Sequence, residues 1–376
     1  MRILHIGKYY APQRGGIERH TQALAQWCVA AGDQVGVLVH QRPGHWRGTQ
    51  ETIAGVDVRR TGCIAAPVYT PISPLFAFEL AQVLRERQPD VLHLHFPNPS
   101  CFAVLASPAA RRLPWIVHWH ADVPPDSPDW RLRTAYRVYR PFEQATLARA
   151  RAIVATSQAY LDASVALAPW HAKASVIPLG IAPGDAPTAR VDLWPAHAGL
   201  RLLGVGRLSR YKGFSVLIEA LARIADASLL LIGHGECERE LRALATARGL
   251  ADRIVFAGEL DDDTLAAAYA SADAFVLPSL DRSEAFGLVL LEAMRAGLPI
   301  IASAIAGSGV GSVVADNETG LLVTPGDVQE LAQAIDRLRD GDLRRRLGEA
   351  GRHRWRTLFS LDNSASQVRQ LYQEIA

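Results

Sequence analysis

Two carboxylates stand eight residues apart in the segment Ser283–Met294, which follows an apolar run typical of a buried strand. Glu284 comes just before a predicted helix, so its carboxylate would lie near the free backbone amides of Phe286 and Gly287. Glu292 lies two turns further on among apolar neighbours, and a buried carboxylate needs a polar partner. A helix-dipole partner and a solvent-facing glutamate are the plainer interpretations, but the sequence context favours two carboxylates that bind a polar ligand.

Two cations follow the first strand-like run of the second half of the chain. Arg207 and Lys212 stand five residues apart in the loop Gly206–Gly213, so both side chains can reach one diphosphate. Arginine offers a planar fork of donors, and lysine offers a point charge. The only other lysines are Lys8 and Lys173, so a lysine at a junction of loop and helix is unusual for this sequence. A solvated basic loop is the alternative.

A glycine pair, Gly15 and Gly16, opens the first helical segment. Paired glycines before a helix let a phosphate approach the backbone N–H groups at the positive helix end; a plain turn without a ligand is the alternative. The pair does not belong to a G-x-G-x-x-G motif. The second strand-like run, Val35–Val39, is followed by His40 and Gln41 instead of an acidic residue. Both departures weaken the interpretation as a dinucleotide-dependent dehydrogenase.

Four histidines end two strand-like runs of the first half. His93 and His95 end one run, and His118 and His120 end the next. A histidine at the carboxyl edge of a strand can hydrogen-bond a polar ligand. We expect one histidine of each pair to point to the opposite face of the sheet. A structural role is the alternative for each of them, and His5 is assigned a structural role.

Strand-like runs alternate with helical segments along the whole chain, which predicts βαβ units and parallel sheets. The first series begins with a strand at Arg2–Ile6 and a helix at Ile17–Ala31. It includes a long helix, Asp129–Ala150, broken or kinked at its proline, and it ends at the strand Ala174–Ile177. The second series begins with the strand Arg201–Val205. In open parallel sheets ligands bind beyond the carboxyl ends of the strands, which is where the candidate residues stand.

The region around residues 178–199 is rich in proline and glycine and poor in large apolar side chains, as linkers are. We therefore predict an N-terminal Rossmann-like domain over residues 1–182 and a linker over residues 183–198. A C-terminal Rossmann-like domain follows over residues 199–357. Residues 358–376 form a predicted helix that packs back on the first domain. The predicted fold class is α/β, with the two domains facing each other across a cleft.

Charge and composition exclude several classes of protein. The net charge is +2, and residues 1–198 carry 20 Lys/Arg against 14 Asp/Glu without a long basic stripe, so nucleic-acid binding is not indicated. No apolar run approaches the roughly 18 residues of a spanning helix, and the first residues lack the pattern of a signal peptide. The four cysteines are scattered without a C-x-x-C pair. This favours a reducing cytosol over a disulfide framework or a zinc site.

Taken together, these motifs resemble family 4 of the retaining glycosyltransferases, which have the GT-B fold. The resemblance covers essentially the whole chain: the glycine pair, the strand-end His120, the G-R-L-x-x-x-K-G loop and the Glu-x7-Glu segment. The segments H-W-H-A-D (118–122) and F-P-N-P (96–99) are most similar to the bacterial subgroup that assembles O-antigens and exopolysaccharides, often from GDP-mannose or related GDP-sugars. The implied function is transfer of a hexose to a saccharide or polyprenyl-diphosphate-linked acceptor in cell-surface polysaccharide synthesis.

The resemblance implies that the domain over residues 1–182 is the acceptor side and that the domain over residues 199–357 binds the nucleotide sugar. It also implies a role for each matching residue. Arg207 and Lys212 would hold the donor diphosphate and stabilise the charge of the leaving group. Gly15 and Gly16 would contact the phosphates or the acceptor through their backbone. Glu292 would accept hydrogen bonds from the ribose hydroxyls.

The transferred sugar would be oriented by Glu284 and the amides of Phe286 and Gly287, and His120 would approach it from the first domain. The implied catalytic set is His120, Glu284, Arg207 and Lys212. Further implied donor-binding residues are Gly233, Gly258, Glu259, Leu260, Ala285 and Leu288, with the nucleotide base near Gly258–Leu260. The implied acceptor-side residues are His95, Asn98 and Asp122.

No metal and no cofactor are expected besides the nucleotide-sugar co-substrate, for which a GDP-sugar is favoured. Retention in this family is explained by attack on the face from which the phosphate departs, so a glycosidase-like carboxylate pair is not required. Asp261 and Asp263 form an Asp-x-Asp pattern, but their position before a helix favours N-capping. The segment Ala306–Gly311 is smaller and richer in glycine than the corresponding loop of many relatives, which predicts a reshaped sugar pocket.

The helical segment Trp130–Arg140 places Arg133, Arg137 and Arg140 on one face. Together with the basic segment Arg111–Trp115, this face predicts a patch for a polyprenyl-linked acceptor and peripheral contact with an anionic membrane. An arginine-rich solvated face is the alternative. The expected location is the cytoplasm, at the cytoplasmic face of the inner membrane if the patch binds lipid.

Other functions on the same fold remain as alternatives. They are a UDP-sugar-dependent transferase, a nucleotide-sugar 2-epimerase, a phosphorylase and a non-catalytic nucleotide-sugar binder. The epimerase needs catalytic carboxylates that the sequence does not place. The phosphorylase needs a lysine for pyridoxal phosphate, and the C-terminal half offers only Lys212. The set of Arg207, Lys212, Glu284 and Glu292 argues against a non-catalytic binder.

Overall fold

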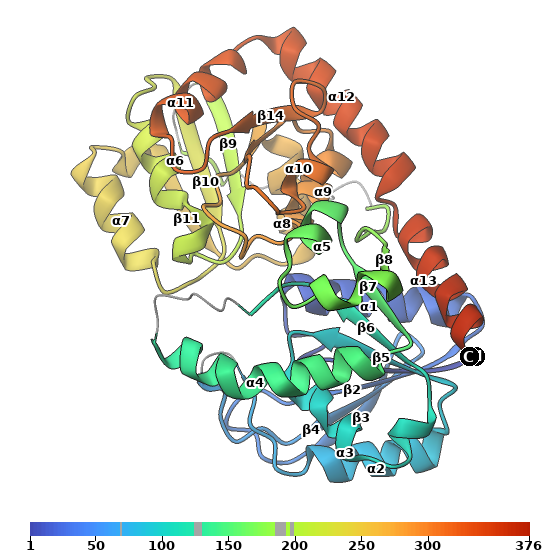
Figure 1. Cartoon of the computed structure of the whole chain (residues 1–376). Coiled ribbons are helices and arrows are strands. Elements are labelled where there is room, and N and C mark those ends of the chain that lie inside the picture. Colours follow the sequence, from blue (N-terminus) through green and yellow to red (C-terminus); the bar gives the residue numbers. More distant parts are fainter. Residues whose placement is uncertain (68–69, 124–129, 185–192, 196–198) are drawn as a thin grey trace. The chain divides into compact units, whose positions relative to one another are not determined.

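The computed structural model describes residues 1–67, 70–123, 130–184, 193–195 and 199–376. The chain divides into two compact units, which we describe separately (Figure 1). Unit 1 comprises Met1–Ala182 and Leu361–Ala376, and unit 2 comprises Pro183–Ser360. Most of the predicted linker, 183–198, lies outside the described residues.

The described part of unit 1 forms an eight-stranded sheet in the order β3-β4-β2-β1-β5-β6-β7-β8. Strand β3 pairs antiparallel with β4, and the other neighbours are parallel. The strand order changes direction between β1 and β5, which is the point where ligands bind in open parallel sheets. The strands are β1 (Arg2–Ile6), β2 (Gln34–His40), β3 (Thr49–Ile53), β4 (Val56–Thr61), β5 (Val91–Phe96), β6 (Trp115–Trp119), β7 (Ala152–Ala155) and β8 (Ala174–Val176).

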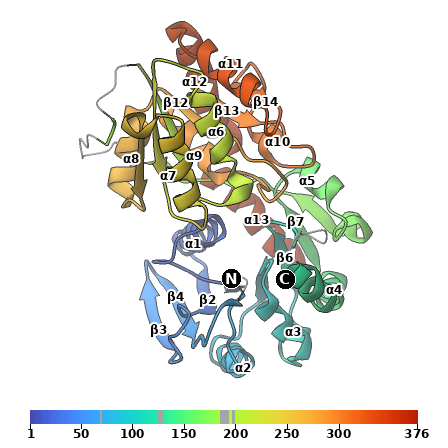
Figure 2. The ribbon, with the colours of Figure 1, turned by 90° about the vertical axis from the view of Figure 1, so that its left-hand side faces the viewer.

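Helices cover both faces of this sheet, with α1 and α13 on one face and α2 and α3 on the other (Figure 2). Of the break or kink predicted at Pro141, the break is wrong, because α4 continues across the proline as one helix; the kink stays a prediction. Pro141 and Arg137, one turn earlier, are both exposed, so the carbonyl that the proline leaves without a donor can bind water. The helices are α1 (Gly16–Ala30), α2 (Phe76–Arg87), α3 (Ala103–Ala106), α4 (Trp130–Arg149), α5 (Gln158–Ala163) and α13 (Leu361–Ile375).

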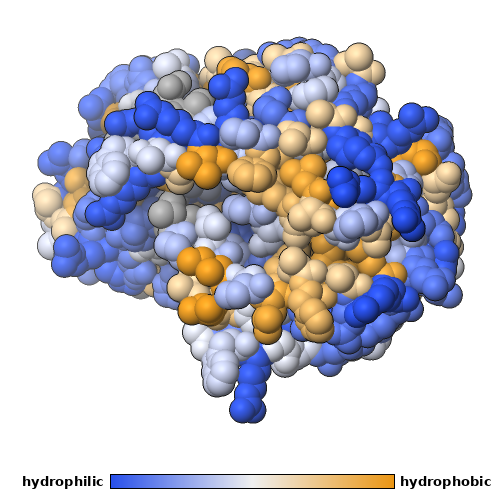
Figure 3. All heavy atoms as spheres, turned by 60° about the horizontal axis from the view of Figure 1, so that its bottom comes forward, coloured by the Kyte–Doolittle hydropathy of each residue, from blue (hydrophilic) through white to orange (hydrophobic). Residues whose placement is uncertain are grey.

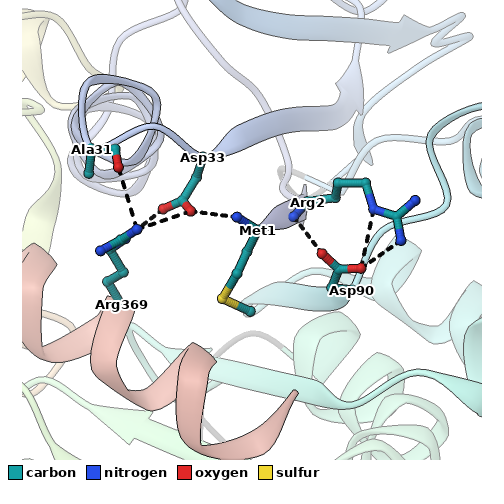
Figure 4. Close-up of polar contacts among 6 residues, drawn as sticks. All are labelled: Met1, Arg2, Ala31, Asp33, Asp90 and Arg369. Carbon is teal, nitrogen blue, oxygen red and sulfur yellow. Dashed lines mark hydrogen bonds and ion pairs between the residues drawn. The ribbon is translucent and has the colours of Figure 1, made fainter.

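The C-terminal helix α13 packs on unit 1, as predicted. Val368 and Tyr372 are buried in the core beside α1, and Arg369 donates to the carboxylate of Asp33 at 2.7 Å (Figure 4). The amino group of Met1 lies 2.8 Å from the same carboxylate. Burial alone would raise the pKa of Asp33, but these two cations hold it below its ordinary value. The helix is therefore fastened by an apolar seam and by a charged contact.

The described part of unit 2 forms a six-stranded parallel sheet in the order β11-β10-β9-β12-β13-β14. Helices α6, α7 and α11 cover one face, and α8, α9 and α12 cover the other (Figure 1). The strands are β9 (Leu200–Val205), β10 (Ala227–Ile232), β11 (Ile254–Gly258), β12 (Ala274–Leu277), β13 (Ile300–Ser303) and β14 (Gly320–Val323). The helices are α6 (Phe214–Leu221), α7 (Glu238–Ala247), α8 (Asp262–Ser271), α9 (Leu288–Ala296), α10 (Val310–Val313), α11 (Val328–Arg337) and α12 (Gly341–Leu358).

Across the described ranges, no helix combines the length and the apolar character needed to cross a membrane.

Candidate functional site

The predicted donor residues of unit 2 lie at the carboxyl edge of its sheet, beside the point where the strand order changes direction. This point falls between β9 and β12. The loop after β9 carries Lys212, and the loop after β12 carries Glu284. The two loops are joined by a backbone hydrogen bond of 2.7 Å from Leu280 to the carbonyl of Tyr211. The topology thus brings together two segments that are far apart in the sequence.

A buried ion pair forms the centre of this edge. The ammonium group of Lys212 lies 2.6 Å from the carboxylate of Glu284, and both residues are less than 10% exposed. The hydroxyl of Ser279 donates to the same carboxylate oxygen at 2.9 Å. Burial alone would lower the pKa of Lys212, but Glu284 and Tyr211 raise it above its ordinary value. Lys212 therefore stays charged, and its three N–H donors allow it to bind Glu284 and a ligand anion together.

Glycines leave bare backbone at the ends of the neighbouring strands. A Cβ on Gly233 would overlap the carbonyl oxygen of Gly206, and one on Gly206 would lie 3.3 Å from Cε of Lys212. A side chain at Gly206 would therefore fill the space beside the buried ammonium group, and one at Gly233 would collide with the backbone of the loop that carries Lys212. Gly258 ends β11, and Glu259 and Leu260 follow it at the same edge of the sheet. Their predicted contact with a base stays a prediction.

Helix α9 begins at Leu288, two residues after the start at Phe286 that the sequence predicts, because Gly287 adopts a left-handed conformation with φ 82°. Phe286 and Gly287 therefore precede the helix instead of opening it. Glu292 is buried in α9, and its carboxylate accepts a hydrogen bond of 2.8 Å from the hydroxyl of Tyr269 on α8. The expectation that this carboxylate needs a partner is confirmed, and its contact with a ribose stays a prediction.

The glycine-rich segment Ala306–Gly311 lies directly against the Glu284 loop. The hydroxyl of Ser308 donates to the carbonyl oxygen of Glu284, and the amide of Gly309 donates to the carbonyl of Ala285 at 2.7 Å. Larger side chains in this segment would therefore displace the loop that carries Glu284, which is the predicted sugar-binding loop.

The other cation of the loop after β9 has a different carboxylate partner. Arg207 is partly exposed, and its guanidinium lies 3.1 Å from Glu236. The structure therefore pairs Arg207 and Lys212 with separate carboxylates, and their joint hold on one diphosphate stays a prediction. Asp261 caps α8 by accepting from the amide of Thr264 at 2.8 Å, which confirms the N-cap interpretation of the Asp-x-Asp pattern.

In unit 1 the glycine pair opens α1, as predicted. A Cβ on Gly15 would overlap the carboxylate of Glu18, whereas one on Gly16 would meet nothing within 4 Å. Burial raises the pKa of Glu18. A phosphate at this helix end would therefore require Glu18 to take up a proton or to turn away.

The histidines of β5 and β6 lie on one face of the sheet. Nδ1 of His95 lies 3.0 Å from Nε2 of His120, and the rings of His93 and His95 stack with centroids 4.5 Å apart. The expectation that one histidine of each pair points to the opposite face is wrong. Residues two apart in a strand share a face, so His118 and His120 stack in the same way, with centroids 4.3 Å apart.

The remaining acceptor-side residues have structural partners. Asn98 caps a short 3-10 helix by accepting from the amide of Ser100, and its side-chain nitrogen is buried without a partner among the described residues. Asp122 accepts from the indole of Trp119 at 2.9 Å and from the hydroxyl of Ser164 at 2.6 Å. Their contact with an acceptor stays a prediction.

Comparisons with known proteins match both units. The family described as "Glycosyl transferase 4-like domain" matches residues 15–180, and "Glycosyl transferases group 1" matches residues 196–354. The O-antigen chain mannosyltransferase C of Escherichia coli is 30% identical over 99% of this chain and 98% of its own length. The phosphatidyl-myo-inositol mannosyltransferase of Mycobacterium leprae is 32% identical over 100% of this chain and 97% of its own. The chain belongs to family 4 of the glycosyltransferases.

The fold of this glycosyltransferase agrees with that assignment. It resembles the sucrose-phosphate synthase of Thermosynechococcus elongatus with a TM-score of 0.80 and 27% identity, over 99% of this chain and 98% of that one. The predicted GT-B fold, with two Rossmann-like units, is confirmed.

Three hydroxyl-bearing residues of the glycosyltransferase hold candidate site residues, although the sequence alone assigned no role to any of them. Ser279 holds Glu284, Tyr269 holds Glu292, and Thr21 lies 3.3 Å from Nδ1 of His95. The place of Ser279 directly after β12 was a usable signal, because side chains at strand ends face the ligand edge. Tyr269 and Thr21 reach their partners from helices, and only the packing of the fold brings them there.

Proposed function

We propose that this glycosyltransferase moves mannose or a related hexose from a GDP-sugar, with retention, to a saccharide or polyprenyl-diphosphate-linked acceptor in cell-surface polysaccharide synthesis. The observation that carries the proposal is the buried ion pair of Lys212 and Glu284 at the switch point of unit 2. The two relatives named above are both mannosyltransferases, which supports the choice of sugar. A UDP-sugar donor is the second candidate.

In this proposal unit 2 binds the donor. Lys212, helped by Arg207, neutralises the diphosphate, and Glu292 accepts hydrogen bonds from the ribose. Glu284 orients hydroxyls of the sugar, and His120 of unit 1 donates to the ligand. The chemistry needs no metal, because cationic side chains offset the charge of the leaving group.

Transfer follows the front-face route of the family. The acceptor hydroxyl oxygen bonds to the anomeric carbon on the face from which the diphosphate leaves, and its proton passes to the departing phosphate oxygen. One glycosidic bond forms and one sugar–phosphate bond breaks, so no further reactant is required. Formation of the glycoside and GDP, without an epimerised nucleotide sugar, would separate transfer from the 2-epimerase alternative.

Thermal-shift measurements against GDP-, UDP-, ADP- and dTDP-sugars test the donor. A donor at about 100 times its Kd stabilises the folded protein by about 2.7 kcal/mol, which corresponds to several degrees in Tm. We expect the largest shift with GDP-mannose, and we expect Arg207→Ala and Lys212→Ala each to reduce it. Arg210→Ala is the matched control, because Arg210 is an exposed cation of the same loop. A shift that survives both substitutions would contradict the diphosphate site.

We also propose that α4 provides a peripheral membrane contact. Arg133, Arg137 and Arg140 are exposed on this helix, as are Trp130 and Phe142. Figure 3 shows hydrophobic side chains gathered on one face of the molecule. Exposed apolar residues beside arginines suit the surface of an anionic bilayer.

Sedimentation with liposomes tests this contact. The protein should pellet with vesicles that contain phosphatidylglycerol at low salt, and less so with pure phosphatidylcholine, because each arginine near an anionic surface contributes about 1 kcal/mol. The triple variant Arg133→Gln, Arg137→Gln and Arg140→Gln should stay in the supernatant, whereas Arg344→Gln and Arg345→Gln together should still pellet. Binding that ignores lipid charge would remove the proposal.

A further inference from the structure

Six histidines lie buried together on one face of the sheet of unit 1, and the proposed function uses only one of them. The strand register explains the grouping: His5 of β1 is paired with His93 of β5, and His95 is paired with His118 of β6. His120 follows on the same face, and α1 adds His20 over the rings of His118 and His120. Each neutral imidazole ring carries one N–H donor and one acceptor nitrogen, and buried polar groups of this kind are normally hydrogen-bonded.

Five of the rings are joined edge to edge, in a pair and a row of three. In the pair, Nε2 of His93 lies 3.2 Å from Nδ1 of His118, and the row of three contains His5, His95 and His120. Nδ1 of His5 lies 3.0 Å from Nε2 of His95, with ring centroids 5.3 Å apart and planes 20° apart. Nδ1 of His95 lies 3.0 Å from Nε2 of His120, again with centroids 5.3 Å apart and planes 14° apart. In both contacts of the row the distance between ring centroids is about the N···N distance plus the two distances from a centroid to its nitrogen. The centroids and nitrogens therefore lie nearly on one line, and the two rings are nearly coplanar. This is the geometry of an N–H···N hydrogen bond.

The same nitrogens also satisfy the spacing of a metal site, because His5, His93 and His95, and likewise His95, His118 and His120, bring ring nitrogens within 4.8 Å of one another. A tetrahedral zinc ion holds its nitrogen ligands about 3.3 Å apart and needs their lone pairs to converge on one point. Here two of the contacts are shorter and the ring axes point at each other. A hydrogen-bonded chain fits the geometry better than a metal.

The hydroxyl of Thr21 gives the chain its direction. It lies 2.8 Å from the carbonyl oxygen of Ile17, which can only accept, so the single hydroxyl proton is used there. The same oxygen lies 3.3 Å from Nδ1 of His95 and must therefore act as the acceptor. The proton of neutral His95 is thus on Nδ1, where it is shared between Thr21 and His120.

The other protons follow from this one. Nε2 of His95 then carries no proton, and its lone pair accepts a hydrogen bond from Nδ1–H of His5. Nε2 of His120 accepts from His95, so neutral His120 carries its proton on Nδ1. Nδ1 of His120 is buried and has no partner in the described part of the chain, and the residue is 5% exposed at the carboxyl end of β6. A buried N–H group without an acceptor is costly, and a ligand oxygen would satisfy it.

We propose that Thr21, His95 and His5 form a one-directional hydrogen-bond chain that fixes His120 as the Nδ1–H tautomer, which donates to an oxygen of the bound ligand. The chain excludes His120 as a base at Nε2, because that lone pair already accepts from His95. Thr21, His95 and His5 are positioning residues. The identity of the acceptor oxygen, a sugar hydroxyl or a phosphate, rests on the proposed function; the tautomer does not.

Nitrogen-15 NMR of the full chain, labelled at histidine and kept in EDTA, tests the tautomer directly. Two-bond proton–nitrogen correlations distinguish Nδ1–H from Nε2–H, and the loss of one signal set in His120→Gln assigns His120. We expect Nδ1–H in the natural protein and in Thr21→Ser, and a mixture of tautomers in Thr21→Val, which lacks the acceptor. Nε2–H in the natural protein, or an unchanged pattern in Thr21→Val, would overturn the chain.

Titration and kinetics then test the donor role. A shift of the His120 Nδ1 signal with GDP-mannose but not with GDP indicates a sugar hydroxyl, and a shift with GDP alone indicates a phosphate. Asparagine places its amide nitrogen near the position of Nδ1, whereas glutamine reaches toward that of Nε2. We therefore expect His120→Asn to keep the transfer rate within about tenfold, and His120→Gln to lose at least about 100-fold. Equal rates, with Nδ1–H intact, would overturn the donor role and leave the tautomer standing.

Discussion

Replacing Lys212 with methionine is expected to lower the rate of sugar transfer about 100-fold to 1,000-fold, because a preorganised charge at the leaving group is lost. The same change should destabilise unit 2 by roughly 3 kcal/mol, because it leaves the buried carboxylate of Glu284 without its cation. Both side chains are less than 10% exposed, so water cannot replace the missing partner. Steady-state transfer assays and urea unfolding of the same preparation measure the two effects.

A double variant separates the two effects. Lys212→Met combined with Glu284→Gln removes both charges and keeps the side-chain volumes, and glutamine can still accept from the hydroxyl of Ser279. Its stability should return close to that of the natural protein, while its rate should stay low. Arg210→Met, in the same short turn but exposed, is the control and should change neither quantity. A double variant that recovers its activity would mean that the ion pair is structural only.

Sequence patterns located the edge of unit 2 where these residues lie, because the signals are local. An apolar strand followed by a polar loop and a helix places the loop at the carboxyl edge of a parallel sheet. The pattern identified the loops of Lys212 and Glu284 and the N-cap at Asp261 without any knowledge of their neighbours. The local pattern could not predict that Lys212 and Glu284 bind each other, because they lie 72 positions apart in the sequence.

The features that the sequence did not predict are of two kinds: contacts between residues far apart in the chain, and a strand whose side chains are exposed to solvent. The antiparallel strand β3, which no pattern in the sequence predicts, is exposed along almost all its length and so lacks the apolar alternation that reveals a strand. The contact of Tyr372 with His93 joins α13 to β5 across 279 residues. The error about the faces of the histidine pairs is different in kind. Side chains along a strand alternate between the two faces, so histidines two positions apart lie on the same face. The sequence already contained this information, and the prediction treated the paired histidines as if they were adjacent.

Lowering the pH from 7 to 6 is expected to remove roughly 4 kcal/mol from the free energy of unfolding of unit 1. Burial lowers the pKa of His5 to about 3 and those of His20 and His40 to about 4. Burial also lowers the pKa of four further histidines well below its ordinary value, and the other rings of the cluster add to this effect; they are His93, His95, His118 and His120. Only the unfolded chain, with histidine pKa values near about 6.5, takes up these protons in this range.

The sign follows from the direction of these shifts. Each histidine has a lower pKa in the folded state, so its contribution is fully present above pH 6.5 and is lost as the pH falls toward the folded values. The linkage relation gives somewhat under 1 kcal/mol for each of these seven histidines between pH 7 and pH 6. Glu143 of unit 1 has the opposite effect: burial raises its pKa to about 7 in the folded state, so it takes up a proton in the same range and offsets about 1 kcal/mol of the loss. Hydrogen exchange of peptides from β1, β5 and β6 measures this loss, and peptides from β9 to β12 serve as the internal comparison.

His20 provides a sharp variant for this test, because neither of its ring nitrogens has a partner among the described residues. His20→Leu therefore sacrifices no hydrogen bond, yet it removes one of the seven histidine protons, so the loss of stability between pH 7 and pH 6 should shrink by somewhat under 1 kcal/mol. His353→Ala, at an exposed histidine of unit 2, should leave the pH dependence of unit 1 unchanged. Equal stability of unit 1 at pH 7 and pH 6 would contradict the neutral histidine cluster. It would also remove the physical basis for a His120 that carries a single proton.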